Sequence, residues 1–331
     1  MPPGPYQAPR WLPGGDLQTL WAVMLGRPRL DYRRERWELP DGDFIDLDWV
    51  NGSTDAPLLV LFHGLEGSSE SHYARHLMDE ARKQGWRGVV PHFRGCSGEL
   101  NRLPRAYFAG DADEIGYILN RLRMAERAPL RVVGVSLGGN ALLKWLEREG
   151  EGARAVAERV VVLSAPLDLP TAGATLDQGF TRFYTARFLK TLKAKALAKL
   201  DVHAMPYDRG AIEVIDTIHA FDTRVTAPLH GYRDADDYWG QAASKPGLGS
   251  IRVDTLLINA RNDPFMPGHV LPSREEVSDR VSLEFPEDGG HVGFVSGPFP
   301  GNFRWLRSRV LDFLDGAEPD GCHTRRFEKA T

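Results

Sequence analysis

A serine flanked by glycines is the part of the sequence whose residue types and spacing most directly predict chemistry. Gly134-Val135-Ser136-Leu137-Gly138 follows an apolar, β-branched run and precedes a pattern typical of a helix. Gly-x-Ser-x-Gly between a strand and a helix predicts a nucleophile elbow, a strained turn from which the hydroxyl protrudes. Glycine fits two residues to either side because larger side chains there would collide with neighbouring backbone. We therefore predict that Ser136 is a nucleophile that attacks acyl carbon.

A serine hydroxyl is a weak nucleophile at neutral pH, so it needs a base and an acid that orients the base. In proteins with this elbow, the order along the chain is Ser, then Asp or Glu, then His. Asp263 follows the apolar run 254–260, and His291 lies in a glycine-rich loop after the run 281–285. We predict that Asp263 and His291 complete a triad with Ser136.

Other interpretations of these residues stay open in the sequence. Asp168 also follows a strand and competes as the acid, whereas Asp288 is too close to His291 along the chain for an easy approach. Asp263 precedes a proline and could therefore serve only as a turn residue, and His291 could be a loop residue without a catalytic part. Histidines in weaker contexts include His63, His92, His203, His269 and His323.

Acyl transfer also requires N–H donors for the oxyanion of the tetrahedral intermediate. The residue after the nucleophile, Leu137, supplies the first predicted donor. The loop His63-Gly64-Leu65-Glu66-Gly67 follows the apolar run 58–62 and predicts the Leu65 N–H as the second donor. The alternative for this loop is a glycine-rich connection without a catalytic part.

The elements that must position these residues alternate along the chain. Helical periodicity covers 71–84, 109–122 and 137–149. Strands that alternate with helices predict an α/β protein with a mostly parallel, doubly wound sheet. The runs 33–39 and 44–50, which Pro-Asp-Gly separates, predict an antiparallel hairpin. The eight predicted strands are 33–39, 44–50, 58–62, 88–93, 130–135, 159–165, 254–260 and 281–285.

The interval 167–250 interrupts this alternation and predicts a helical cap inserted into the α/β core. An apolar stripe within it is interpreted first as packing against the sheet domain and second as the lining of a substrate channel. Lys190, Lys193, Lys195 and Lys199 are expected on the solvated face. The stripe comprises Phe180, Phe183, Tyr184, Phe188, Leu189 and Leu192. The predicted organisation is an N-terminal arm (1–30), a core (31–166 and 251–316), the cap (167–250) and a disordered tail (317–331).

Composition narrows the function classes. The 331 residues include 41 Lys and Arg against 45 Asp and Glu, so the net charge of −4 favours no nucleic-acid partner. Two distant cysteines, Cys96 and Cys322, do not suggest a disulfide framework. We find no signal-peptide pattern and no apolar run long enough to span a membrane, so we expect a cytoplasmic protein. No metal or cofactor motif is present, and both are expected to be absent.

Five segments spread over nearly the whole chain resemble one family: LPGGDLQTLW, PHFRGCSGELN, FDTRVTAPLHGYRDADDYW, NARNDPFMP and GGHVGF. They resemble the α/β-hydrolase superfamily, and within it the AB hydrolase 4 family of YheT and the ABHD1- and ABHD3-type proteins. The resemblance implies the α/β-hydrolase fold, a charge-relay triad at Ser136, Asp263 and His291, and activity on carboxylic esters. Asp16 stands where a histidine is expected before the Leu-Gln-Thr stretch, so the role of the N-terminal arm stays open.

The predicted function is that of a serine esterase or lipase-like enzyme acting on a small-molecule acyl ester, with lipid contact at most transient. The first alternative is an acyltransferase that uses the same triad; His203 and Asp208 match an H-x-x-x-x-D pattern of some acyltransferases. The second alternative is an inactive binding protein on a hydrolase scaffold. The sequence leaves the acyl chain length, the alcohol and the oligomeric state open.

Overall fold

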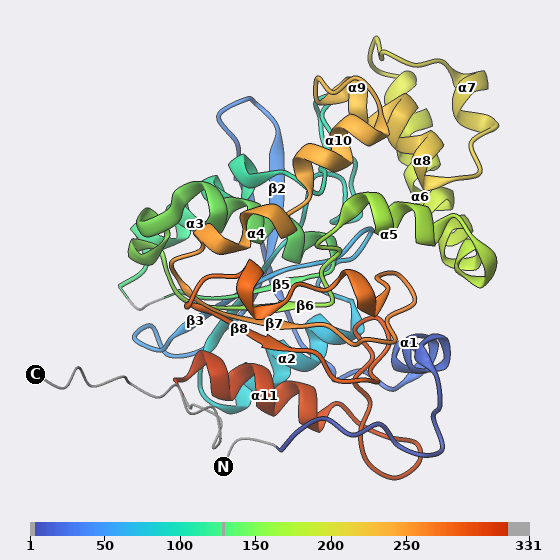
Figure 1. Ribbon diagram of the computed structural model, residues 1–331. Coiled ribbons are helices and arrows are strands. Elements are labelled where there is room, and N and C mark those ends of the chain that lie inside the picture. The colour runs from blue at the N-terminus through green and yellow to red at the C-terminus, as the bar shows by residue number, and fades with distance from the viewer. Residues whose placement is uncertain (1–3, 128–129, 317–331) are drawn as a thin grey trace, which may run out of the picture.

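A central sheet of eight strands organises the chain (Figure 1). The computed structural model describes residues 4–127 and 130–316, so the predicted tail, 317–331, lies outside the described residues. The strands are β1 (Arg33–Glu38), β2 (Phe44–Val50), β3 (Leu58–Phe62), β4 (Arg87–Pro91), β5 (Leu130–Val135), β6 (Ala157–Leu163), β7 (Asp254–Ile258) and β8 (Val281–Glu284).

The order of strands across the sheet is β1-β2-β4-β3-β5-β6-β7-β8. β2 pairs antiparallel with both β1 and β4, and every other neighbouring pair is parallel. All five residues of β3 are buried, as expected for a strand covered on both faces. The predicted α/β-hydrolase fold, a mostly parallel eight-stranded sheet that begins with a hairpin, is confirmed.

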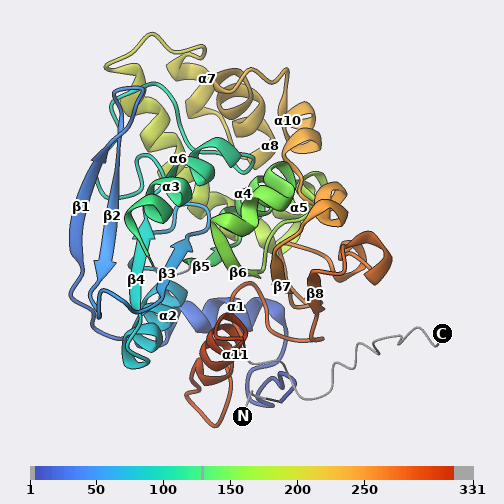
Figure 2. The ribbon, with the colours of Figure 1, turned by 90° about the vertical axis from the view of Figure 1, so that its left-hand side faces the viewer.

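Helices cover the two faces of the sheet (Figures 1 and 2). On one face lie α3 (Ala112–Ala125) and α4 (Leu137–Glu149), and on the other lie α2 (His72–Lys83) and α11 (Arg304–Leu314). Apolar residues of α3 recur every three or four positions and point into the core. Asp111 begins this helix by accepting a hydrogen bond from the Glu114 N–H at 3.2 Å.

The N-terminal arm lies along the segment that follows β8. Its helix α1 (Gly15–Met24) is preceded by an irregular stretch. The Tyr6 hydroxyl donates to the carbonyl of Val295 at 2.8 Å, and the Trp21 indole donates to the carbonyl of Pro300 at 2.9 Å. These contacts join the two ends of the described chain.

Residues 167–250, which we call the cap, form helices and no strand, as predicted. Figure 1 shows them together at the upper right. The cap has an apolar cluster of its own that includes Ile212, Phe221 and Trp239. Its helices are α5 (Leu169–Leu176), α6 (Arg182–Leu200), α7 (Arg209–Glu213), α8 (Ile218–Phe221), a π-helical turn (Asp222–Thr226), α9 (Ala227–Leu229) and α10 (Ala235–Ala242). Short 3₁₀ helices lie at Gly150–Ala155, Gly179–Thr181, Lys245–Ser250, Gly268–Val270 and Arg274–Glu276.

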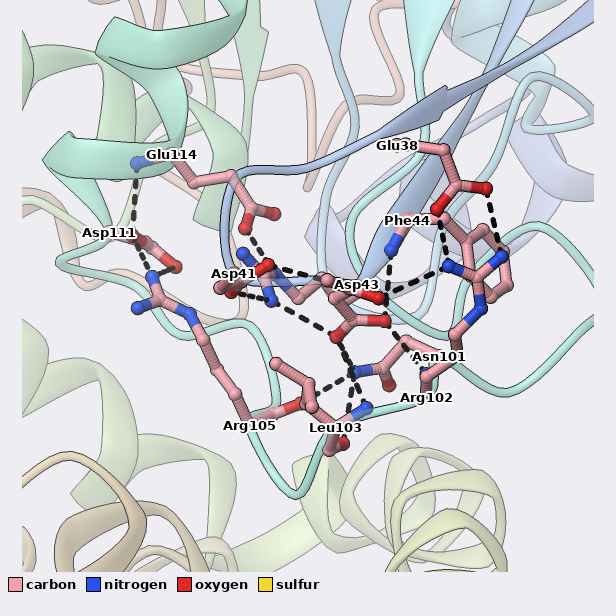
Figure 3. Close-up of polar contacts among 12 residues, drawn as sticks. Glu38, Asp41, Asp43, Phe44, Asn101, Arg102, Leu103, Arg105, Asp111 and Glu114 are labelled. Atoms are coloured by element: carbon pink, nitrogen blue, oxygen red, sulfur yellow. Dashed lines mark hydrogen bonds and ion pairs between the residues drawn. The ribbon is translucent and has the colours of Figure 1, made fainter.

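The prediction that the lysines of α6 form a solvated face is wrong for two of the four. Lys199 is buried and donates to the carbonyls of Asn101 and Leu103. Asp43 fixes that loop by accepting hydrogen bonds from the Asn101 side chain and the Arg102 N–H (Figure 3). The reason is that α6 packs across core loops, so long side chains on its inner face reach polar groups below it.

The second of these lysines, Lys195, also points inward. Its ammonium lies 2.7 Å from the carboxylate of Glu66 and 3.4 Å from the sulfur of Cys96. The other two behave differently: Lys190 is exposed, while the half-buried Lys193 donates to the carbonyls of Glu213 and Ile215. Only Lys190 therefore fully matches the expectation.

Candidate active site

Ser136 occupies a strained turn between β5 and α4. Its φ of 52° and ψ of −123° lie in a region that L-residues rarely adopt. A Cβ at Gly138 would lie 2.4 Å from the His63 carbonyl oxygen, and a Cβ at Gly134 would lie 2.7 Å from the Cα of Gly139. The two glycines therefore allow the backbone contacts that hold the turn, as the Gly-x-Ser-x-Gly pattern predicts.

Three predicted site residues meet at this turn although they lie far apart in sequence. The Ser136 Oγ lies 3.0 Å from Nε2 of His291, and Nδ1 of His291 lies 2.8 Å from Oδ2 of Asp263. The carboxylate of Asp263 is buried and also accepts the Phe265 N–H at 2.8 Å. The ring of Phe265 lies 4.2 Å from that of His291, so it restricts the tilt of the imidazole.

The competing acids have other partners. Asp168 caps α5 by accepting the Thr171 N–H at 3.0 Å. Asp288 accepts a hydrogen bond from the side chain of Asn262 at 2.8 Å. The geometry therefore favours Asp263 as the partner of His291.

The other histidines also make contacts away from Ser136. His92 pairs with Asp48 at 2.9 Å. His203 lies 2.7 Å from the Arg102 carbonyl, while Asp208 of the same H-x-x-x-x-D pattern caps α7. His269 lies in a 3₁₀ turn, and His323 is outside the described residues.

His63 has a structural part beside the site. Its Nδ1 lies 2.8 Å from the Gly64 carbonyl oxygen, and its Nε2 accepts the Phe93 N–H at 3.1 Å. Burial lowers the pKa of His63 to about 3, so the ring is neutral at physiological pH. Because Nε2 accepts a hydrogen bond, the proton of the neutral ring is on Nδ1, which donates to the Gly64 carbonyl. These two hydrogen bonds fix the start of the loop that carries Leu65.

The two predicted oxyanion donors face the same space. In the described part of the chain, neither the Leu65 nor the Leu137 backbone N–H donates to a protein acceptor. Leu137 begins α4, where helix geometry leaves the first N–H groups without partners. A Cβ at Gly64 would lie 3.0 Å from the Cβ of Ser136, which places this loop directly against the nucleophile candidate.

A cavity of about 730 Å³ opens above these groups, between the sheet and the cap. Ser136, His291 and the two leucines form part of its wall, and cap residues provide much of the rest. Four of the six residues of the apolar stripe line it: Phe183, Tyr184, Phe188 and Leu192. These four side chains therefore face the cavity, whereas Leu189 packs in the apolar cluster of the cap and Phe180 is exposed.

Comparison with known families identifies this architecture. A family model described as the alpha/beta hydrolase fold matches residues 57–298. The chain belongs to the α/β-hydrolase family. Within residues 4–127 and 130–316 of this hydrolase, no group of three His, Cys, Asp or Glu side chains is arranged to hold a metal ion. None of the helices described there combines the length and the apolarity needed to cross a bilayer.

Relatives define the subfamily of this α/β-hydrolase. It is 43% identical over 286 residues to YheT of Escherichia coli, named as a candidate esterase, a match that covers 85% of the chain and 84% of the relative. It is 28% identical over 316 residues to the phospholipase ABHD3 of Mus musculus, covering 92% and 76%. The predicted resemblance to YheT and ABHD3-type proteins is thereby confirmed.

A solved structure supports the same fold. The esterase EaEST of Exiguobacterium antarcticum superposes with a TM-score of 0.53 at 17% identity, covering 85% of this hydrolase and 98% of that chain. At this level of identity, the similarity concerns the fold of the hydrolase alone.

Several polar residues around the site had no assigned role in the sequence. Gln18, Thr19, Asn262 and Ser164 all bind the loop of His291. The only signal for Gln18, Thr19 and Asn262 was the resemblance of the Leu-Gln-Thr and Asn-Asp-Pro stretches to the family, and Ser164 lies in neither stretch.

Proposed function

We propose that this α/β-hydrolase cleaves carboxylic esters through an acyl-enzyme formed on Ser136. The observation that carries the proposal is the continuous hydrogen-bond path from Ser136 through His291 to the buried Asp263, at 3.0 and 2.8 Å. The names of two relatives, a candidate esterase and a phospholipase, agree with an ester as substrate. The path ends at a cavity large enough for an acyl chain.

The proposed reaction has two halves. Nε2 of His291 accepts the hydroxyl proton as the Ser136 Oγ attacks the ester carbonyl, and then returns that proton to the departing alcohol. Water, deprotonated by the same nitrogen, then attacks the acyl carbon; the bond to Ser136 Oγ breaks, Nε2 returns the proton to that oxygen, and the acid is released. Asp263 holds Nδ1 of the imidazole and stabilises the cation formed in each half.

The negative charge of each tetrahedral intermediate needs donors that are already in place. The N–H groups of Leu65 and Leu137 are proposed for this, since neither donates to an acceptor within residues 4–127 and 130–316 and both residues border the cavity beside Ser136. Donors fixed by backbone need not reorganise when the charge develops, which is the basis of their catalytic effect.

The apolar cavity favours esters with medium or long acyl chains over acetates. Each buried methylene contributes about 0.8 kcal/mol, equivalent to about fourfold in kcat/KM. A series of p-nitrophenyl esters from acetate to dodecanoate should therefore show rising kcat/KM up to a length limit. Acetate as the best substrate would contradict an acyl-binding role of the cavity.

The decisive experiment compares the wild-type protein with Ser136→Ala. The variant should fold normally, lose ester hydrolysis by roughly a millionfold and no longer react with a fluorophosphonate probe. Turnover within tenfold of wild type would exclude Ser136 as the nucleophile. Absence of activity and labelling in the wild type itself would favour the binding-protein alternative.

The acyltransferase alternative uses the same acyl-enzyme and differs in the acceptor. Adding a short alcohol and measuring free acid against new ester distinguishes the two outcomes. The H-x-x-x-x-D residues have no part in it, because His203 and Asp208 bond to a carbonyl and a helix N-terminus.

A further inference from the structure

Four consecutive backbone N–H groups around His291 all donate to side chains. The Gly289 N–H donates to Gln18 Oε1 at 2.8 Å, and the Gly290 N–H donates to Asn262 Oδ1 at 3.0 Å. The His291 N–H donates to Thr19 Oγ1 at 2.8 Å, and the Val292 N–H donates to Ser164 Oγ at 3.0 Å. Two of the four acceptors belong to α1, some 270 residues away along the chain; the Thr19–His291 bond alone spans 272 positions.

Gln18 is fully buried, and its side-chain amide makes four contacts. Besides the Gly289 N–H, its oxygen accepts the Asn262 side-chain N–H at 3.0 Å. Its nitrogen donates to the Leu12 carbonyl at 3.0 Å and, at 3.4 Å, to Asp288. One side chain thus ties the loop of His291 to Asn262, the residue immediately before Asp263.

The backbones approach too closely at this contact for larger residues. A Cβ at Gly290, whose φ is +60°, would lie 2.6 Å from the Gly15 carbonyl oxygen, and a Cβ at Gly15 would lie 1.9 Å from the Asn262 carbonyl oxygen. Such packing places the acceptors of α1 where the loop needs them. The backbones at Gly15, Asn262 and Gly290 are therefore packed closely against one another, and glycine is required at two of these three positions.

The loop has no regular secondary structure to hold it. Val292 and Phe294 adopt positive φ values of 53° and 44°, which are unfavourable for β-branched and aromatic residues. Strain of this kind persists only where surrounding contacts over-determine the backbone. The four side-chain acceptors supply those contacts on both sides of His291.

We propose that Gln18 and Thr19 are positioning residues that hold His291 between Ser136 and Asp263. The inference rests on the proposed function, since it assigns these residues to the base of that reaction. It gives a role to the Leu-Gln-Thr stretch that does not depend on Asp16, whose carboxylate contacts Tyr184 of the cap at 3.2 Å. Neither Gln18 nor Thr19 takes part in bond making.

The main test replaces Thr19 with valine, which keeps the side-chain shape but removes the acceptor of the His291 N–H. A displaced imidazole should lower kcat by about tenfold to a hundredfold. KM should stay within about twofold, because valine keeps nearly the same side-chain shape at the cavity wall that Thr19 lines. The rate of fluorophosphonate labelling should fall in parallel with kcat. Thr19→Ser, which keeps the oxygen, should restore kcat to within about threefold of wild type.

Tyr6→Phe is the matched control. It removes a buried hydrogen bond of the same length, 2.8 Å, between the same N-terminal arm and the same C-terminal segment, but away from the four N–H groups. A purely structural role of Thr19 predicts equal effects of Thr19→Val and Tyr6→Phe on the melting temperature and on kcat. The positioning role predicts similar melting temperatures, with kcat lowered only in Thr19→Val.

Two results would overturn the proposal: a kcat of Thr19→Val that equals that of Tyr6→Phe, or Thr19→Ser as slow as Thr19→Val. If Thr19→Val does not fold, Thr19→Ala, which removes the acceptor without adding a methyl group, takes its place with the same criteria. Ser136→Ala is measured alongside. If it is inactive while Thr19→Val is unaffected, only this inference fails; if it remains active, the proposed function fails as well.

Discussion

Lys195 of α6 and Glu66 of the loop after β3 form an ion pair of 2.7 Å that joins the cap to the core beside Leu65. The Glu66 side chain is only 8% exposed, and it also accepts the Tyr107 hydroxyl at 2.8 Å. Glu66 has a φ of 55°, so the loop that carries the proposed oxyanion donor is strained as well as tied to the cap.

Lys195→Met should therefore affect both stability and turnover. Loss of the cation that pairs with the buried Glu66 carboxylate costs about 1–3 kcal/mol. Displacement of the Leu65 N–H should lower kcat/KM by about threefold to tenfold. Urea unfolding and ester hydrolysis measure the two effects. Lys190→Met, on the exposed face of the same helix, is the control; equal results for the two variants would contradict a role for the pair.

Asp263→Asn should lower kcat by about four orders of magnitude, because an amide favours the wrong imidazole tautomer. Asp168→Asn should remain close to wild type, because Asp168 only caps α5 and asparagine is an equally good cap. Hydrolysis rates of both purified variants provide the comparison. A larger loss in Asp168→Asn would mean that Asp168 is the acid.

Gly138→Ala and Gly240→Ala place the same methyl group in two helices with opposite expected results. At Gly138 the Cβ would meet backbone atoms of Phe62 and His63 within 2.8 Å, so unfolding free energy should fall by about 1–3 kcal/mol. At Gly240 nothing lies within 4 Å, and alanine should stabilise α10 by up to about 1 kcal/mol. Urea unfolding of both variants decides; a neutral Gly138→Ala would show that the elbow packing is adaptable.

The stability of the protein should fall on acidification because of His72. Burial lowers its pKa from 6.5 to about 4, so the unfolded chain takes up this proton at a higher pH than the folded chain. The unfolding free energy is thus unaffected by this group above pH 6.5 and decreases as pH falls from 6.5 towards 4. The decrease amounts to about 2 kcal/mol at pH 5.

The measurement compares urea unfolding at pH 7.5 and pH 5.0 for the wild type and His72→Gln. Glutamine retains a donor for the Val292 carbonyl, which lies 3.0 Å from the histidine, but does not titrate. The variant should lose less stability between the two pH values than the wild type. Identical pH dependence would show that His72 is not the source.

Local pattern sufficed for the elements and for the elbow. Strands such as β3 are continuous apolar runs because both faces of the sheet are covered, and Ser136 is marked by glycines that its own turn requires. The order Ser, Asp, His along the chain then indicated Asp263 and His291. These features depend on neighbours in sequence, so the sequence displays them.

Contacts between distant segments left no such mark. Thr19 and His291 are joined by a single hydrogen bond across 272 positions, and no periodicity encodes it. Lys199 sits in a stretch rich in lysine that is typical of a solvated helix face, yet the loop beneath it turns two carbonyls towards its ammonium. Burial of that kind is decided by how the cap packs on the core.

The hydrogen bonds between α1 and the loop of His291 also have consequences for truncated forms of the protein and for the stage of synthesis at which the loop can be held in place. A fragment trimmed to the family match, residues 57–298, would retain Ser136, Asp263 and His291 but none of the α1 acceptors. During synthesis, α1 leaves the ribosome early, whereas the loop of His291 follows only when nearly the whole chain has been made. The loop of the proposed catalytic base can therefore gain its hydrogen bonds to α1 only after residues up to that loop have been synthesised.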